Sequence, residues 1–109
     1  MNALEQRTCR ALPAGTRSLA RAQIDNFLAL LPGWAHRDGA IDKVFSFGSY
    51  AQTMAFVNGV AAIAERENHH PDMLVGYDKC RVSYCTHSVG GISENDFICA
   101  EKIEALCRL

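Results

Sequence analysis

The chain has 109 residues, 49% of them hydrophobic, which suits one domain with a single core. Its formal net charge is -1, so it lacks the basic surface that direct binding of nucleic acid requires. No stretch reaches the roughly 20 apolar residues of a membrane span, and the first residues lack the apolar core of a signal peptide. These features disfavour a membrane protein and predict a cytoplasmic one.

The cysteines number five, an odd count, and none of the paired short spacings of zinc ribbons or redox dithiols is present. We therefore predict reduced, mostly buried thiols in place of disulfides or a cluster. The five are Cys9, Cys80, Cys85, Cys99 and Cys107.

A single domain is expected over residues 1–109, with residues 1–17 forming a loosely ordered lead-in that contains Pro and Gly. Ser18 is predicted to cap a first helix, and Pro32-Gly33 is predicted to end it. The apolar residues at helical spacing are Ile24, Phe27, Leu28 and Leu31.

Asp38-Gly39 separates two extended runs between Trp34 and Phe47, a strong signal for a β-hairpin. Lys43 falls on the apolar face of the second run, where its stem can pack while its amine stays in water, unless the strand is irregular there. The residues of that face are Ile41, Lys43, Phe45 and Phe47.

A second helix is predicted to open at Ser49, which has Gln52 at capping-box spacing. One apolar stripe consists of Tyr50, Met54, Val57, Ala61 and Ala64, and it is widened by Phe56, Val60 and Ile63. A stripe this broad indicates a helix covered on two sides, by the sheet and by other helices, including those of a partner subunit.

Pro71 disfavours helical geometry at His70, so the second helix should end at Asn68 or His69 and place both histidines on a helix-to-strand corner. An extended run from Met73 to Tyr77 follows, with a turn near Asp78. A strand over Lys79 to Thr86 is predicted next, and the residues that share one of its faces are Cys80, Val82, Tyr84 and Thr86.

His87 follows that strand, and Gly90-Gly91 permits a tight turn. Ser93 and Asp96 resemble a capping box for a last helix that carries Phe97, Cys99, Ile103 and Leu106. The order α-β-β-α-β-β-α predicts an α+β fold, a four-stranded antiparallel sheet with helices packed on one face. Its open face or edge is a candidate dimer surface.

Three of the four histidines fall between Glu65 and His87, at loops or element ends. Histidine exchanges protons near neutral pH, as a dehydration requires. Structural roles remain open: His69 can interact with the helix dipole, His70 and Glu65 can be solvated, and His87 can bond nearby backbone. Asp96 can serve only to stabilise the N-terminus of its helix.

Two other chemistries are disfavoured. Three histidines can hold zinc, but two of these are consecutive and no His-x-x-x-His pair is present, so we predict no metal. Cys85 and His87 lie two residues apart on a strand with no orienting third group, which argues against a cysteine nucleophile.

The sequence resembles the pterin-4a-carbinolamine dehydratase family from the first helix to the C-terminus. The matching motifs are Glu65-Arg66-Glu67-Asn68-His69-His70-Pro71, Tyr77, Thr86-His87, Gly90-Gly91-Ile92-Ser93 and Asp96, with Leu31-Pro32-Gly33-Trp34, Val44-Phe45-Ser46-Phe47 and Ala55-Phe56-Val57-Asn58 upstream.

The resemblance implies a cofactorless hydro-lyase that forms a homodimer or homotetramer. Its substrate would be 4a-hydroxytetrahydrobiopterin, dehydrated to quinonoid dihydrobiopterin in tetrahydrobiopterin recycling for aromatic amino-acid hydroxylases such as phenylalanine hydroxylase. The resemblance also implies the same fold as the one predicted above. Alternatives on the same fold are a non-catalytic dimerisation or coactivator module and a molybdopterin-related role.

By the same resemblance, the catalytic residues are His69, His70 and His87. Substrate contacts fall on Asn68, His69, His70, Cys85, Thr86, His87 and Ser88, and supporting roles on Glu65, Pro71 and Asp96. The family often has serine or threonine where Cys85 stands, so a hydroxyl hydrogen bond is not carried over there. We hypothesise that His69 and His87 flank the C4a hydroxyl and N5 of the pterin, that either can be the acid, and that His70 orients the ring.

Overall fold

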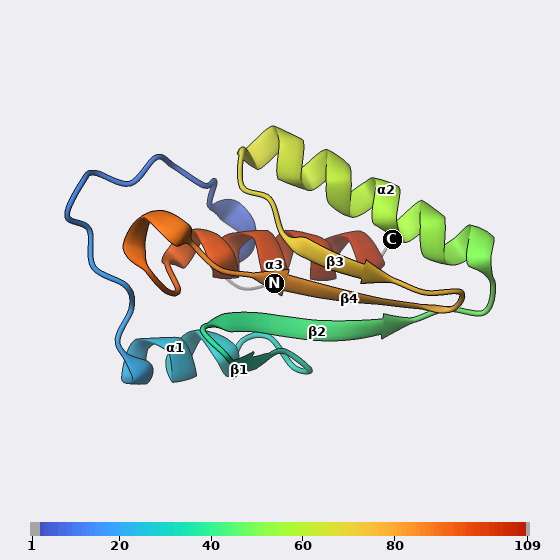
Figure 1. The fold of residues 1–109 in the computed structure, drawn as a ribbon, viewed down its shortest axis with the longest axis horizontal. Coiled ribbons are helices and arrows are strands. Elements are labelled where there is room, and N and C mark those ends of the chain that lie inside the picture. The colour runs from blue at the N-terminus through green and yellow to red at the C-terminus, as the bar shows by residue number, and fades with distance from the viewer. Residues whose placement is uncertain (1–2, 109) are drawn as a thin grey trace.

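In the computed structural model, which describes residues 3–108, one antiparallel sheet is backed by helices (Figure 1). The elements are η1 (Ala3–Gln6), α1 (Arg21–Leu28), β1 (Ala35–Arg37), β2 (Ala40–Ser46), α2 (Tyr50–Glu67), β3 (Asp72–Val75), β4 (Lys79–Tyr84), η2 (His87–Val89) and α3 (Glu94–Cys107). The predicted order is confirmed.

The sheet has the strand order β1-β2-β4-β3, and every neighbouring pair is antiparallel. Phe45 lies opposite Cys80, and Met73 lies opposite Val82. Successive side chains of a strand point to opposite faces, and only the face that includes Phe45, Cys80 and Val82 is buried in the core with the helices. Val44, on the other face, is 52% exposed.

The β1–β2 hairpin turns at Asp38-Gly39 as predicted. Both residues adopt left-handed backbone, with φ of 53° at Asp38 and 76° at Gly39. Positive φ at both central residues suits a two-residue hairpin, and glycine reaches it at little steric cost.

Lys43 departs from its expected environment. Its stem lies along the core face, with the amine 4.9 Å from the Phe45 ring centroid. The amine is not free in water: it donates to Glu104 Oε2 at 2.9 Å, the oxygen that also accepts the Trp34 indole N–H at 3.0 Å. This contact spans 61 residues of sequence, so strand periodicity alone could not indicate it.

The buried face of α2 also differs from the predicted stripe. It consists of Thr53, Phe56, Val60, Ile63 and Ala64, whereas Tyr50 is 52% exposed and Ala61 lies at the surface. Phe56, Val60 and Ile63, which were expected only to widen the apolar stripe, form the centre of the buried face. Ser49 is the N-cap as predicted, because its Oγ accepts from Gln52 N. The Gln52 side chain accepts from Gly48 N, one residue earlier than in a capping box.

Ser18 is not a helix cap, which corrects the sequence prediction. Leu19 N donates to Ile92 O at 2.8 Å, so the chain is tied to the segment before α3 at this point. The helix therefore begins later, at Arg21, where the Gln23 side chain accepts from Ala20 N at 2.9 Å.

The N-terminal segment contributes to the core: Leu4 of η1 is 1% exposed, and η1 packs on α3. The cysteines are less buried than predicted. Cys80 and Cys99 are buried, Cys9 and Cys85 are half-buried, and Cys107 is exposed; all five are free thiols. Within residues 3–108, none of the helices has the length and apolar character needed to cross a membrane.

The left-handed turn generates a test of the hairpin. Replacing Gly39 by alanine should lower the free energy of unfolding by roughly 1–2 kcal/mol, because a Cβ is disfavoured at that φ. Gly76, in the β3–β4 turn, is the matched control, since its φ is not positive and an added Cβ would meet only ordinary contacts. Urea unfolding of both variants measures the difference; equal losses would contradict the turn assignment.

Candidate active site

The C-terminus of α2 fixes the position of His69. Asn68 is left-handed at φ 52°, and the backbone N–H groups of Asn68 and His69 donate to Glu65 O and Ala64 O at 3.4 and 3.1 Å. This is the hydrogen-bond pattern of a Schellman motif. Strand β3 begins at Asp72, so the predicted helix-to-strand corner is confirmed at both histidines.

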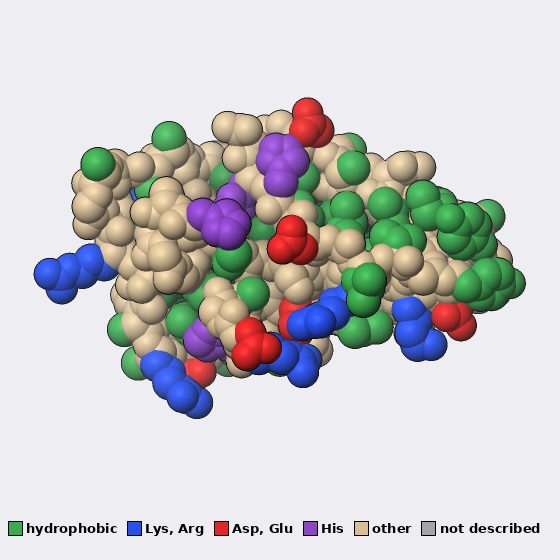
Figure 2. Space-filling view, viewed as in Figure 1, with side chains coloured by type: hydrophobic (Ala, Val, Ile, Leu, Met, Phe, Trp, Pro, Cys, Tyr) green, Lys and Arg blue, Asp and Glu red, His purple; other side chains and the backbone are tan. Residues whose placement is uncertain are grey.

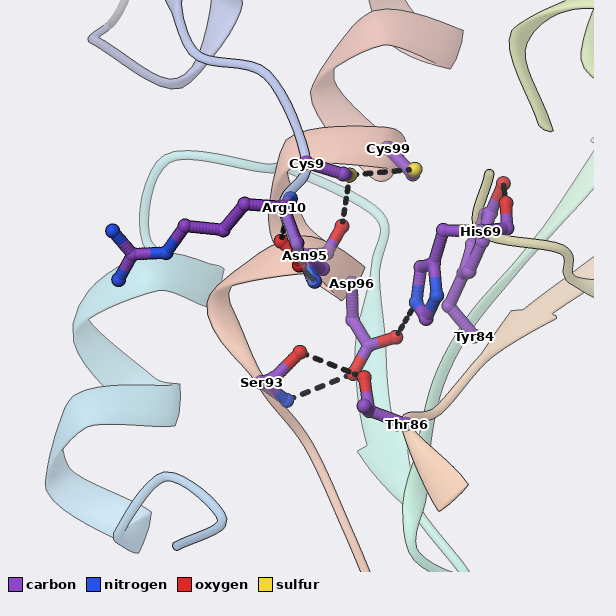
Figure 3. Close-up of polar contacts among 9 residues, drawn as sticks. All are labelled: Cys9, Arg10, His69, Tyr84, Thr86, Ser93, Asn95, Asp96 and Cys99. Carbon is purple, nitrogen blue, oxygen red and sulfur yellow. Dashed lines mark hydrogen bonds and ion pairs between the residues drawn. The ribbon is translucent and has the colours of Figure 1, made fainter. Parts of the chain in front are cut away.

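His69 pairs with Asp96 across 27 residues of sequence. Its Nε2 lies 2.6 Å from Asp96 Oδ1 (Figure 3). The Asp96 side chain is fully buried, and that of His69 is 15% exposed. The His69 ring stacks on Tyr84, with centroids 5.2 Å apart and an interplanar angle of 21°. The imidazole is thus held on one face and at one nitrogen.

Asp96 accepts two further hydrogen bonds through its other oxygen. Oδ2 accepts from Thr86 Oγ1 at 2.8 Å and from Ser93 N at 2.9 Å. Thr86 Oγ1 also lies 2.7 Å from Ser93 Oγ. The Thr86 hydroxyl donates its only hydrogen to Asp96, so Ser93 Oγ must be the donor in the contact between the two hydroxyls. One carboxylate therefore joins the end of α2, the end of β4 and the start of α3.

The pair changes the protonation of His69. Burial by itself would lower the pKa of His69, but the hydrogen bond and charge of Asp96 outweigh it, so the pKa is raised above its usual range. Because Nε2 carries the proton shared with Asp96, Nδ1 is the ring nitrogen left for a ligand; among the described residues nothing hydrogen bonds to it.

His70 occupies a more open position than His69. Its Nε2 lies 2.7 Å from Glu65 Oε1, and the two side chains are 55% and 78% exposed. An exposed pair of this kind contributes little to stability. Glu65 instead restricts the rotation of the His70 ring at the protein surface.

His87 lies at the start of η2, one residue after Thr86, and is exposed. The loop is closed by Thr86 N donating to Gly91 O at 2.7 Å, with a left-handed Gly90 at φ 69°. Figure 2 shows histidine side chains gathered over the end of α2 and the segment that follows β4. Asp96 thus brings together the segments that carry His69 and His87.

The remaining predicted contacts surround this centre unequally. Asn68 and Ser88 are exposed and Cys85 and Pro71 are half-buried, whereas Thr86 is buried and bonded to Asp96. Burial and the nearby carboxylates raise the pKa of the Cys85 thiol, which opposes its use as a nucleophile. Across residues 3–108, His, Cys, Asp and Glu side chains form no group of three that could hold a metal ion.

A large cavity lies away from the histidines. A cavity of about 640 Å³ lies between the start of α2 and the end of α3, lined by residues that include Phe47, Gln52, Phe56 and Leu106, and it contains no histidine. We place the site at the histidines in spite of that volume, because the polar groups converge there and the large cavity is mainly apolar.

Two partners of the site were missed by the sequence analysis. Tyr84 was assigned only to the packed face of its strand, and Ser93 only to a helix cap. Strand alternation gave a usable signal, since Tyr84 and Thr86 share a face that points toward the helices. The stack of Tyr84 on His69 and the hydrogen bond from Thr86 to Asp96 depend on how α2 and α3 pack on the sheet, which no local pattern specifies.

The fold and the site together define an α+β protein whose site is centred on a buried aspartate paired with a half-buried histidine, beside exposed histidines. The chain belongs to the pterin 4 alpha carbinolamine dehydratase family, whose model matches residues 17–106. The resemblance seen in the sequence is therefore confirmed.

Similar proteins cover nearly the whole chain. A Nitrosomonas eutropha protein named "Putative pterin-4-alpha-carbinolamine dehydratase" is 50% identical over 104 residues, 94% of this chain and 92% of its own. A Nitrosospira multiformis protein of the same name is 48% identical over 106 residues, 97% of this chain and 94% of its own.

Two solved structures share the fold. The transcriptional coactivator/pterin dehydratase from Brucella melitensis has a TM-score of 0.79 at 30% identity, covering 83% of this chain and 98% of its own. A pterin dehydratase-like protein described as a RuBisCO assembly factor in the alpha-carboxysome has a TM-score of 0.56 at 30% identity, covering 67% and 84%.

The raised pKa of His69 is testable by NMR titration of its ring protons. Asp96→Asn should lower that pKa, since burial then acts without the opposing carboxylate. Because the folded pKa is raised, the ion pair stabilises the fold fully below the unfolded pKa of histidine and is lost as pH rises through the folded pKa. Glu65→Gln is the control and should leave His69 unchanged. An unaltered His69 titration in Asp96→Asn would refute the coupling.

Proposed function

We propose that this protein dehydrates 4a-hydroxytetrahydrobiopterin to quinonoid dihydrobiopterin by histidine acid–base catalysis. The role would be tetrahydrobiopterin recycling for an aromatic amino-acid hydroxylase in the cytoplasm. Family membership supports the reaction class, and the observation that carries the mechanism is the hydrogen bond between the half-buried His69 and the buried Asp96.

The reaction needs one proton delivered and one removed. The C4a–O bond breaks as the hydroxyl leaves with an added proton as water, and the electron pair of the N5–H bond forms the C4a=N5 double bond. We assign the acid to His69, whose raised pKa keeps a proton available for Nδ1 to deliver. His87, exposed on its loop, then accepts the N5 proton.

The remaining residues support this exchange. Asp96 fixes the orientation of His69 and stabilises its protonated form, and Thr86 acts through Asp96, not through the substrate. His70, held by Glu65, would orient the pterin ring. Asn68, Cys85 and Ser88 would form the rim that contacts it, beside Pro71.

A protein-binding role is the second candidate, supported by the names of both solved relatives, a coactivator and an assembly factor. The end of the molecule near the β3–β4 turn is rich in hydrophobic side chains (Figure 2). Tyr77 is 69% exposed and stacks on Tyr50, which is 52% exposed. Such side chains are candidates for contact with a second copy in a homodimer or homotetramer.

Stopped-flow measurement of carbinolamine breakdown, with the substrate generated by a phenylalanine hydroxylase, tests the reaction. The wild-type protein should accelerate breakdown, and His69→Ala or His87→Ala should reduce that acceleration about 10²- to 10⁴-fold, the usual contribution of a general acid or base.

His36→Ala is the matched control, because His36 is an exposed histidine of β1, a strand that β2 separates from β4 in the sheet. It should retain wild-type activity. Full activity in the His69→Ala, His87→Ala double variant would refute the site, whereas an inactive wild-type protein that binds a protein partner would favour the second candidate.

A further inference from the structure

Two cysteine sulfurs lie close together behind the active site. Cys9 Sγ and Cys99 Sγ are 3.4 Å apart and 90 positions apart in the sequence (Figure 3). A disulfide bond is about 2.05 Å long, so a relative movement of roughly 1.4 Å would bring the two sulfurs to bonding distance. Whether the two sulfurs stay this close depends on the other contacts between the N-terminal segment, which carries Cys9, and α3, which carries Cys99.

The N-terminal segment is held beside α3 by hydrogen bonds. Cys9 N donates to Glu67 Oε1 at 2.8 Å, at the end of α2. The Asn95 side chain bonds the backbone of Arg10 twice, accepting from Arg10 N at 3.2 Å and donating to Arg10 O at 2.8 Å. These bonds keep Cys9 over Cys99, while the chain between Arg10 and Arg21 has no helix or strand that would resist a small shift.

We propose that Cys9 and Cys99 are a reversible disulfide site, closed by a hydroperoxide, that locks the N-terminal segment onto α3. The site does not depend on the dehydratase activity proposed above. Among the described residues, neither sulfur is hydrogen bonded to Asp96 or to a histidine, although the charge of His69 acts on the Cys99 thiol.

The local environment supports thiol chemistry. The hydrogen bond with Cys9 lowers the pKa of the Cys99 thiol, the Tyr84 hydroxyl and the charge of His69 act in the same direction, and burial opposes them. The same hydrogen bond, together with burial, raises the pKa of the Cys9 thiol, so the charge of the deprotonated pair rests on Cys99. Cys9 can then react with an oxidant as its proton passes to the Cys99 sulfur. Cys9 borders a cavity of about 280 Å³ through which a small oxidant can approach.

The oxidation balances in two steps. With hydrogen peroxide, an S–O bond forms at Cys9 as the O–O bond breaks, giving a sulfenic acid and one water. The sulfur of Cys99 then attacks that of Cys9, the S–S bond forms, the S–O bond breaks and a second water leaves. The two thiols supply two electrons and two protons, and a dithiol reductant reverses the change.

Closing this bond should make stability depend on redox state. A cross-link between positions 9 and 99 restricts a long loop in the unfolded chain, which corresponds to a rise in Tm of about 10–20 °C. The thermal transition of the peroxide-treated protein should return to the reduced value after dithiothreitol.

Intact-mass analysis of the full chain, treated with hydrogen peroxide and then alkylated in denaturant, tests the site. We expect a loss of two hydrogens and alkylation of three of the five cysteines. Since Cys85 and Cys99 share the tryptic peptide that runs from Val82 to Lys102, the linked peptides are mapped in a Cys85→Ser variant.

Cys9→Ser should lose both the cross-link and the rise in Tm, whereas Cys107→Ser, which removes an exposed thiol, should keep both. If Cys9→Ser is unstable, Cys99→Ala provides the same comparison from the other side. Five alkylated cysteines after peroxide treatment, or a cross-link that excludes Cys9 or Cys99, would overturn the proposal.

Discussion

The buried carboxylate of Asp96 is the contact on which the site depends. It accepts hydrogen bonds from His69, Thr86 and Ser93, which belong to three separate segments of the chain. Each donor would otherwise be left unsatisfied in the protein interior, at a cost of about 1–3 kcal/mol. The groups that stabilise the N-terminus of α3 therefore also set the geometry and the charge of a histidine at the C-terminus of α2.

This arrangement explains why adjacent histidines have different environments. The Schellman motif at Asn68 turns His69 toward the interior, where Asp96 and Tyr84 hold it, and leaves His70 at the surface with Glu65. His69 is fixed and has a raised pKa, and His87 is exposed on a neighbouring loop. Two such histidines suit a reaction that delivers one proton and removes another. Family membership supports dehydration as the class of reaction.

The features that the sequence predicted well are those encoded by a few consecutive residues. The Asp38-Gly39 turn, the helix end before Pro71 and the order of helices and strands along the chain follow from local backbone preferences, and the histidines were identified from their spacing and family motif. Contacts between distant residues were not predictable in this way. The Lys43–Glu104 pair and the stack of His69 on Tyr84 required the packing of helices on the sheet, as did the buried face of α2.

The Cys9–Cys99 pair belongs to the same group of long-range contacts, and Cys9 precedes the residues 17–106 that the family model matches. Family membership alone therefore gives no reason to expect it. The prediction of unpaired thiols rested on spacing along the chain, whereas the approach of the two sulfurs results from the N-terminal segment folding back onto α3.

A crystal structure with bound 7,8-dihydrobiopterin would show whether the pterin binds at the histidines. We expect the pterin at the end of α2, with its C4a–N5 edge between His69 and His87 and with His69 Nδ1 within hydrogen-bond reach, about 2.6–3.2 Å. The His69–Asp96 bond should remain intact in that complex. A pterin bound in the cavity lined by Phe47 and Leu106, away from the histidines, would contradict this expectation.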